Sequence, residues 1–425
     1  MTDSIPSQLR LIDDALSSFV HTAVRTQLNQ CAPVNRLPPE VLSAIFDLVR
    51  YGSSYSDGLD AGDHAAILQP DNRSLIAVTH VCRQWRDVSL GHAHLWTSVS
   101  THSPFAPTFF ERSRGLPLTV FVRLRQGKPP SIPKQMFLDQ HPRIRVLHIG
   151  LECSLQITHW KKLLQSVAKS LESLTVVTHG YQKDFTANRS LNLLLSFFGA
   201  ERPAALKSLS ISSRTPLIPT DHFPILEHAH LAGFQSRHGF FGNFKLATLF
   251  LLLLNAPRLQ TFHLHLQSTY WHSVHEAFED LGQITLPMMR HLCVTLPPRP
   301  VWATRQYEDP FSGICAMVAS LHMPTTAMVS IQQGSCSRDG EIPLLYIPIT
   351  ASVSAESVLS VDSRETTFIV SGPQTAHFRF LSCFGFNGIL SFVNGAPVLP
   401  APVREKAQAA LATVRALRIH SSADW

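Results

Sequence analysis

The stretch PRIRVLHIG at residues 142–150 contains a phrase that recurs along the chain. Its apolar residues Ile144, Leu147 and Ile149 are separated first by two variable residues and then by one. The later copies are Leu171-Leu174-Val176, Leu206-Leu209-Ile211, Leu226-Ala229-Leu231, Leu259-Phe262-Leu264, Met289-Leu292-Val294, a fainter Thr326-Val329-Ile331, and Val414-Leu417-Ile419. A phrase repeated in this way predicts similar structural units stacked in a row.

Between the phrases lie segments with helical character. The helix candidates are residues 154–170, 189–199, 242–255, 274–281 and 311–321. A short strand alternating with a helix predicts a parallel sheet covered by helices on one face, and therefore an α/β solenoid. The pattern resembles degenerate leucine-rich repeats, although the intervals among the first seven copies vary from about 20 to about 37 residues. A doubly wound α/β sheet is the second interpretation, but it would not require the same phrase at every strand.

Residues 341–381 interrupt this rhythm. The segments LLYIPI, SVLSV, TTFIVSG and HFRF alternate or carry β-branched residues, with no helical pattern between them. We expect strands inserted near the end of the solenoid as a small antiparallel patch. A helix at residues 403–414 and one last repeat strand should follow.

The repeat phrase also predicts a row of exposed side chains. Side chains alternate along a strand, so the residue between the last two apolar positions faces away from the core, and neighbouring strands lie about 4.8 Å apart. This position holds His148, Thr175, Ser210, His230, His263, Cys293 and Ser330, with His265 and Thr295 two residues further on. The row is interpreted either as an ordinary solvated face or as a surface for a protein substrate, with histidines that make recognition sensitive to pH. A third interpretation is a zinc site formed by His230, His263, His265 and Cys293.

A different pattern marks the N-terminal part, where residues 34–46 read VNRLPPEVLSAIF. Proline suits the first turn of a helix, and the carboxylate of Glu40 suits its positive end. A helix from Pro38 or Pro39 would place a set of apolar residues on one stripe: Val41, Leu42, Ile45, Phe46 and Val49. A second helix is predicted over residues 75–89, followed by a short tail that carries Leu95 and Trp96. Such a small helical module encloses little core, so part of its apolar surface should remain exposed and available to bind a partner.

These residues resemble an F-box. The resemblance rests on the Leu-Pro pair, the acidic residue, the helix that ends in Ile45-Phe46, a Cys-x-x-Trp-Arg sequence at residues 82–86 and the late Trp96. It implies a substrate receptor of an SCF-type (cullin–RING) ubiquitin ligase, of the fungal type in which an F-box precedes leucine-rich repeats. The residues expected to contact a Skp-type adaptor are Leu37, Pro38, Val41, Leu42, Ile45, Phe46, Cys82, Trp85, Leu95 and Trp96. One departure is the Gly-, Ser- and Asp-rich spacer at residues 51–73, which a solvated loop would absorb at little entropic cost.

The remaining N-terminal segments divide the chain further. Residues 11–29 predict an amphipathic helix with Ile12, Leu16, Val20, Val24 and Leu28 at four-residue steps. Its stripe would pack on this chain or pair with another helix. We therefore expect four parts: the amphipathic helix at 1–31, the F-box-like domain at 33–99, a proline-rich connector with a strand at 116–124 within 100–140, and the substrate-binding repeats at 141–425.

Composition excludes several classes of protein. Charged residues make up 16% of the chain and hydrophobic residues 44%, which fits a folded protein. The net charge of +6 is spread without a basic run, so we expect neither nucleic acid nor a membrane surface as partner. Seven scattered cysteines without a C-x-x-C pair favour reduced thiols in the cytoplasm or nucleus. The polar N-terminus argues against a secretory signal, and the apolar run at 246–254 is too short to span a membrane and predicts a buried helix.

The common catalytic phrases are also missing from the sequence. It contains no G-x-S-x-G, no G-x-x-x-x-G-K-[ST], no H-E-x-x-H and no G-x-G-x-x-G. We therefore expect a non-catalytic subunit without cofactor or metal, which binds a cullin only through the adaptor. The alternative function is a scaffold protein that binds partners through the solenoid and has no ligase role.

Overall fold

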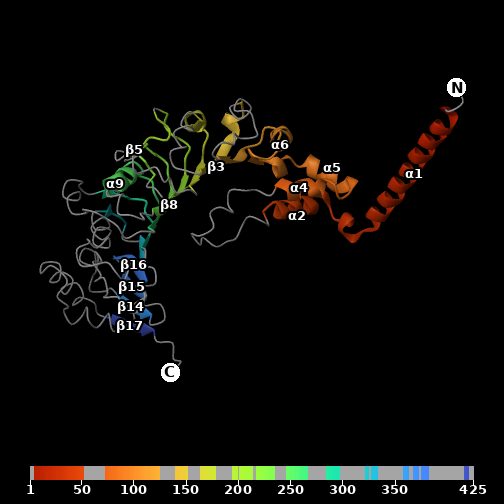
Figure 1. Cartoon of the computed structure of the whole chain (residues 1–425). Helices are drawn as coiled ribbons and strands as arrows, with labels where there is room; N and C mark the ends of the chain where they lie inside the picture. The colour runs from red at the N-terminus through yellow and green to blue at the C-terminus, as the bar shows by residue number, and fades with distance from the viewer. Residues whose placement is uncertain are drawn as a thin grey trace, which may run out of the picture. The chain divides into compact units, whose positions relative to one another are not determined.

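The computed structural model describes residues 4–51, 72–124, 139–151, 163–178, 194–199, 201–213, 217–234, 246–266, 284–296, 321–324, 327–333, 358–362, 367–372, 375–381 and 416–420 (Figure 1). The chain forms two units. The first consists of Met1–Val122 and Pro130–Arg143, and the second of Arg123–Pro129 and Ile144–Trp425.

The first unit is mainly helical. Its elements are α1 (Ser4–Cys31), η1 (Pro33–Arg36), α2 (Pro39–Tyr51), α4 (Asn72–Thr79), α5 (Arg83–Gly91), η2 (Ala93–Trp96), β1 (Ser98–Ser100), α6 (Ala106–Arg112), β2 (Leu118–Leu124) and η3 (His141–Arg143). The helix predicted from Pro38 or Pro39 is confirmed as α2, and the strand predicted at residues 116–124 is confirmed as β2. Strands β1 and β2 pair in parallel.

The single helix predicted over residues 75–89 is wrong, because two helices occupy this segment. Helix α4 ends at Thr79, and α5 begins at Arg83 after an extended Cys82 whose Sγ accepts a hydrogen bond from the backbone N–H of Trp85. A side chain that accepts this bond satisfies one of the donors left open at a helix start. Cys82 therefore acts as the N-cap of a new helix. The spacing of the apolar residues alone predicts one continuous helix here, because it carries no signal for this cap.

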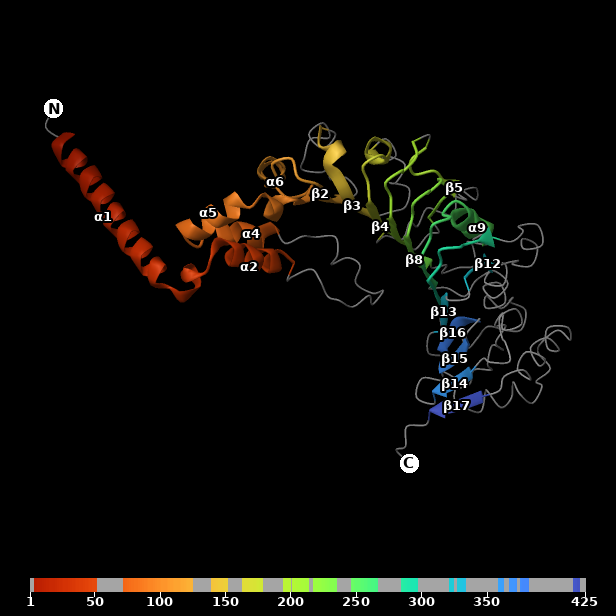
Figure 2. The ribbon, with the colours of Figure 1, turned by 180° about the vertical axis from the view of Figure 1, so that it is seen from behind.

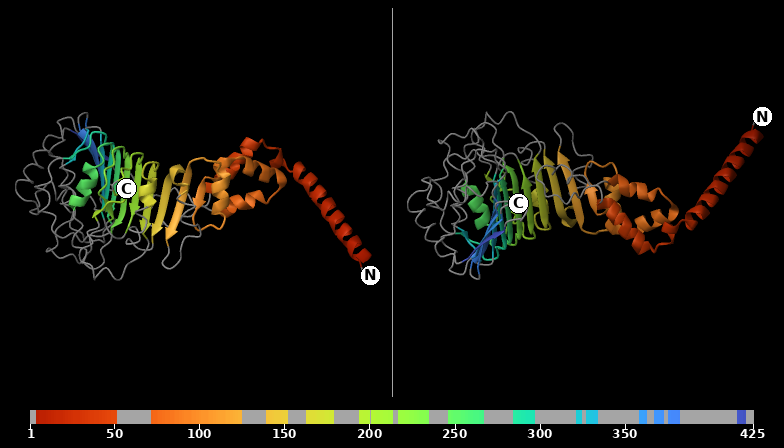
Figure 3. Two further views of the ribbon diagram at one scale, coloured as in Figure 1. Left: turned by 90° about the horizontal axis from the view of Figure 1, so that it is seen from above. Right: turned by 90° about the horizontal axis from the view of Figure 1, so that it is seen from below.

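The second unit contains a row of strands in sequence order. They are β3 (Ile144–Leu151), β4 (Ser173–Thr178), β6 (Ser208–Ser212), β8 (His228–Phe234), β9 (Thr261–Leu266), β11 (His291–Leu296) and β13 (Met328–Gln333), and each pairs in parallel with the next. Figure 3 shows the strands coloured yellow to cyan running side by side. The repeat phrases thus form one sheet, as expected for an α/β solenoid.

The predicted antiparallel patch lies at the C-terminal end of this sheet. Strand β13 pairs in parallel with β16 (Thr375–Leu381), which pairs antiparallel with β15 (Thr367–Gly372), which in turn pairs antiparallel with β14 (Val358–Asp362). The last strand, β17 (Ala416–His420), lies parallel to β14, so the final repeat strand is also confirmed (Figure 2). The helix predicted at 403–414 lies outside the described residues.

The apolar residues of the phrases form the core of the second unit. The first apolar residue of each of the first six copies is at most 1% exposed: Ile144, Leu171, Leu206, Leu226, Leu259 and Met289. Helix α9 (Leu246–Leu254) lies beside the strands (Figure 1), and its Leu249, Phe250, Leu252 and Leu253 are buried, which confirms a buried helix in the apolar run. Among the described residues, no helix is both long and apolar enough to cross a membrane.

The segments between the strands are less uniformly helical than predicted. Residues 163–167 are helical, within the predicted 154–170. The helix predicted at 189–199 is wrong, since Leu194–Leu195 forms the short strand β5, which pairs in parallel with β7 (Ile218–Pro219). A second such pair joins β10 (Ile284–Thr285) to β12 (Leu321–His322). The helix predicted at 274–281, and all of 311–321 except its last residue, lie outside the described residues.

A buried carboxylate explains why the chain turns after β5. Asp221, which is 7% exposed, accepts hydrogen bonds from the Ser196 hydroxyl at 2.7 Å and from the backbone N–H groups of Phe197 at 2.7 Å and Phe198 at 3.1 Å. Donors gathered on one carboxylate in this way replace the backbone bonds that a helix would supply. Asp221 therefore links the segment after β5 to the turn that precedes β8.

Candidate functional site

Helix α2 presents two apolar stripes. One contains Leu42 and Phe46, which are both fully buried. The other contains Val41, Ile45 and Leu48, which follow each other at helical spacing; Val41 is 43% and Leu48 71% exposed, while Ile45 is half-buried. A single helix thus contributes one stripe to its own module and leaves the other uncovered. We call Val41, Ile45 and Leu48 the α2 docking stripe.

Asn35 joins the start of this module to α5. Its Oδ1 accepts a hydrogen bond of 2.6 Å from the indole Nε1 of Trp85, and its backbone carbonyl accepts one of 2.9 Å from the amide of Gln84. The Trp85 ring in turn packs on Phe46 of α2, with 5.1 Å between ring centroids. Trp85 therefore fixes the position of α2 relative to α5 while remaining half-buried itself.

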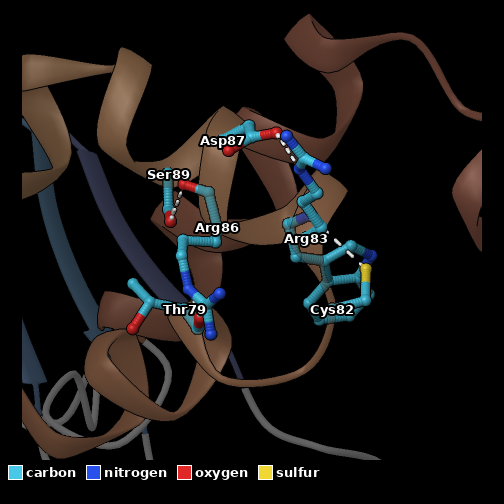
Figure 4. A network of polar contacts seen from close by, with 7 residues as sticks. Thr79, Cys82, Arg83, Arg86, Asp87 and Ser89 are labelled. Atoms are coloured by element: carbon cyan, nitrogen blue, oxygen red, sulfur yellow. Dashed lines mark hydrogen bonds and ion pairs between the residues drawn. The ribbon is translucent and has the colours of Figure 1, made fainter. Parts of the chain in front are cut away.

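The junction between α4 and α5 is held by the Arg86 side chain (Figure 4). Its Nε donates a 2.9 Å hydrogen bond to the backbone carbonyl of Thr79 at the end of α4, and its own carbonyl accepts one of 3.0 Å from the Ser89 hydroxyl. The ion pair between Arg83 and Asp87, 4.0 Å apart, lies on the exposed side of α5 and contributes little. Arg86 thus closes the open C-terminal end of α4, and the Cys-x-x-Trp-Arg sequence has a structural role in addition to any contact with a partner.

Trp96 is a core residue of the module. Its indole Nε1 donates a 2.8 Å hydrogen bond to the carbonyl of Ser89, its ring lies 4.9 Å from the ring of Phe109 in α6, and the guanidinium of Arg112 lies 4.5 Å from its centroid. The side chain is fully buried. The late tryptophan therefore joins α5 to α6 instead of facing solvent.

The residues predicted to contact an adaptor fall into three groups by exposure. Leu42, Phe46, Leu95 and Trp96 are fully buried within the chain, so none of them presents apolar surface to a partner. Leu37, Ile45, Cys82 and Trp85 are half-buried, and Pro38 and Val41 are exposed. The exposed apolar residues of the module outside this prediction include Leu48, Val49, and Val81 in the turn between α4 and α5, which is 56% exposed. The three-residue spacing from Ile45 to Leu48, which places both on one face of a helix, is the sequence signal that could have identified Leu48.

The second candidate surface is the predicted row on the sheet. Strand register places the seven residues at one level across seven neighbouring strands: His148, Thr175, Ser210, His230, His263, Cys293 and Ser330. The flanking apolar residues are at most 3% exposed wherever burial is described. Of the first six, His263 is exposed and the other five are half-buried. His265 and Thr295 pair with each other one level further along.

The histidines of this row differ in their surroundings. Burial lowers the pKa of His148 to about 4, so this imidazole is neutral at physiological pH. The pKa of His263 is lowered by burial first, and then by repulsion from His291 and His228. Within the described part of the chain, no three His, Cys, Asp or Glu side chains are arranged to hold a metal ion, so the zinc interpretation has no support there.

Helix α1 carries a further uncovered stripe. The apolar residues predicted to lie on it are 53–66% exposed, and Phe19 beside them is 73% exposed. The side chains of Thr22 and Thr26 donate hydrogen bonds of 2.8 Å to carbonyls one turn earlier in the helix. The stripe is thus formed as predicted, and its side chains face solvent.

Comparison with protein-family models identifies a domain in the first unit. The family model described as F-box-like matches residues 34–102, which contain α2, α4, α5, η2 and β1. No curated protein matches the chain. The chain therefore carries an F-box-like domain, a module that binds Skp1-type adaptors and is typically found in non-catalytic substrate adaptors of SCF ligases.

Proposed function

We propose that this chain is the substrate-receptor subunit of an SCF-type ubiquitin ligase. The observation that carries the proposal is the F-box-like domain at residues 34–102, whose helix α2 leaves one apolar stripe uncovered. In this role the domain binds a Skp-type adaptor, the adaptor binds a cullin, and the second unit binds a protein substrate. Such a subunit acts in the cytoplasm or nucleus and supplies proximity, while other subunits carry out the chemistry.

The adaptor would contact the exposed and half-buried apolar residues around α2. These are Leu37, Pro38, Val41, Ile45, Leu48, Cys82 and Trp85. Aliphatic side chains on a short helix are rigid anchors, and burying one fully contributes about 1.5–3 kcal/mol. The four fully buried residues serve the same interface indirectly, because they hold α2, α5 and η2 in place.

The substrate would lie on the polar face of the sheet in the second unit. The row from His148 to Ser330 offers imidazole, hydroxyl and thiol groups and no charged side chain. Groups of this kind bind a peptide mainly through hydrogen bonds, which give specificity. The leucine-rich-repeat identity of the solenoid belongs to this proposal, since it is supported by the repeat phrase and by the parallel sheet.

Co-purification tests the proposal. The full chain should retain both a Skp-type adaptor and a cullin, and Leu37→Ala combined with Pro38→Ala should release both while the thermal midpoint of the chain stays unchanged. Leu254→Ala, a change of a 60% exposed leucine on α9, is the matched control and should retain both partners. Retained adaptor in the double variant would refute the contact assignment. Adaptor captured without cullin would favour the alternative, a scaffold protein without a ligase role.

A further inference from the structure

Three neighbouring strands concentrate histidines on the polar face of the sheet. The register aligns β8, β9 and β11 in three levels of three residues: His228, Thr261 and His291; His230, His263 and Cys293; Ala232, His265 and Thr295. Five of these nine residues are histidines, and we call them the histidine array. Because paired residues on adjacent strands lie about 5 Å apart, one extended peptide could contact all five.

The array is ordered and accessible. The rings of His230 and His263 lie 6.2 Å apart at 75°, and His230 Nδ1 lies 3.3 Å from the Ser210 hydroxyl. His228 Nδ1 lies 2.8 Å from the Thr261 hydroxyl. His228, His263 and His291 are exposed, while the other two histidines are half-buried. The side chains are therefore positioned by their neighbours and still face solvent.

Few negative charges accompany the array. Register places the uncharged residues Ser208, Ser210 and Ser212 of β6 beside it on one side, and Met328, Ser330 and Gln332 of β13 on the other. The charged and titratable groups at its margins in the described part of the chain are Glu172 beside β4, Lys207, Glu227, Arg290, Cys293, and His377 and Arg379 of β16. Two carboxylates are among them: Glu227, whose Oε2 lies 3.9 Å from His228 Nε2, and Glu172, which forms an ion pair of 3.7 Å with Arg145. Protonation of the five histidines would thus add positive charge to a face where the register of the described strands places more basic than acidic side chains.

We propose that the histidine array binds an acidic segment of the substrate protein, rich in Asp or Glu, and that binding strengthens as the pH falls. This inference rests on the proposed role of the chain as a substrate receptor. Carboxylates of a ligand close to the array would add negative charge beside it and favour the imidazolium form of the rings that they contact. The array itself contains no arginine, the residue suited to bidentate binding of phosphate, so carboxylates are preferred over phosphoserine.

The linkage between protons and ligand fixes the direction of the effect. In the free protein the pKa of His263 is lowered by burial first, and then by repulsion from His291 and His228. A ligand that relieves this repulsion is bound together with protons, so its affinity rises as the pH decreases. Each proton taken up on binding contributes up to about tenfold in affinity per pH unit within the titration range. Between about pH 7.5 and about pH 6, near the ordinary histidine pKa, we expect at least about tenfold tighter binding.

Fluorescence anisotropy with the adaptor-bound full chain tests this inference. The probes are a labelled oligoglutamate peptide, its glutamine counterpart and a phosphoserine peptide of equal length, each measured at both pH values and constant ionic strength. We expect the oligoglutamate alone to bind more tightly at the lower pH. His230→Gln combined with His263→Gln should remove that gain, whereas His222→Gln combined with His322→Gln, a matched change of two exposed histidines elsewhere in the second unit, should keep it.

The outcomes separate this inference from the proposed function. Equal affinity at both pH values, equal loss in the two double variants, or preference for phosphoserine would overturn the acidic-segment inference. If the array variant unfolds, His291→Gln, an exposed substitution, gives the deciding measurement and should reduce the pH effect. Adaptor retention is measured on the same samples. Loss of the adaptor from the unmodified chain would refute the ligase proposal. Retained adaptor without a pH effect would refute only the acidic-segment inference.

Discussion

Truncating the α2 docking stripe should weaken adaptor binding by a calculable amount. In Val41→Ala combined with Leu48→Ala, the lost contacts come from side chains that are 43% and 71% exposed in the chain alone. Taking about 2 kcal/mol for complete burial of each side chain, the two exposed fractions together contribute about 2 kcal/mol to adaptor binding. The dissociation constant should therefore rise about thirtyfold.

Isothermal titration calorimetry of the purified chain with a Skp-type adaptor measures this change. Surface truncations of this kind usually alter stability by less than about 0.5 kcal/mol, so the thermal midpoint should not move. Leu254→Ala on α9 removes a leucine whose exposure, 60%, lies between those of Val41 and Leu48, and it should leave the affinity unchanged. A dissociation constant that stays within about twofold of the original in the double variant would show that α2 does not dock the adaptor through this stripe.

Three further predictions concern stability. Because burial lowers the pKa of His148 to about 4, the unfolded chain binds more protons than the folded chain below about pH 6.5. Between pH 7 and pH 5 the free energy of unfolding of the wild type, measured with urea, should therefore fall by about 2 kcal/mol more than that of His148→Gln. Equal losses in the two proteins would contradict this. Asp221→Ala leaves the Ser196 hydroxyl and two backbone N–H groups without their acceptor, so it should lower the free energy of unfolding by about 3 kcal/mol. Asp221→Asn should lower it by less. A change below about 0.5 kcal/mol in Asp221→Ala would refute this role of the carboxylate. Trp85→Phe and Asn35→Ala should each lower the free energy of unfolding by about 1–2 kcal/mol, because each removes one partner of the 2.6 Å hydrogen bond. Thermal melts of the double variant should show a loss little larger than that of either single variant. Fully additive losses would show that this hydrogen bond contributes nothing to stability.

The regular part of the second unit could be predicted from sequence because one phrase determines both strand and register. Leu147 and Ile149 point into the core, so His148 must face the other way, and repetition carries this alternation from strand to strand. The connecting segments carry no comparable signal. The run around β5 is apolar at successive positions, which suits a helix as well as a strand, and its conformation depends on Asp221, which lies more than twenty residues later.

The candidate docking site was less predictable for two physical reasons. Helix α2 has apolar residues around more than half of its circumference, and which stripe is covered depends on where α4 and α5 pack. Phe46 is therefore buried and Leu48 exposed, although both are equally suited to either role by residue type. The break between α4 and α5 contains neither Gly nor Pro, and a cysteine is an unusual helix cap, so nothing in the local sequence signals it.

The constant register of the sheet bears on how such a protein can change over evolutionary time. In the main sheet β3, β4, β6, β8, β9, β11 and β13 pair at the same level, so duplication or deletion of one whole strand-and-connector unit would preserve the alignment of every other unit. The polar face would lengthen or shorten in steps of about 4.8 Å, the spacing of adjacent strands. New targets could thus be acquired by changing how many units the chain contains, without redesign of the units that remain.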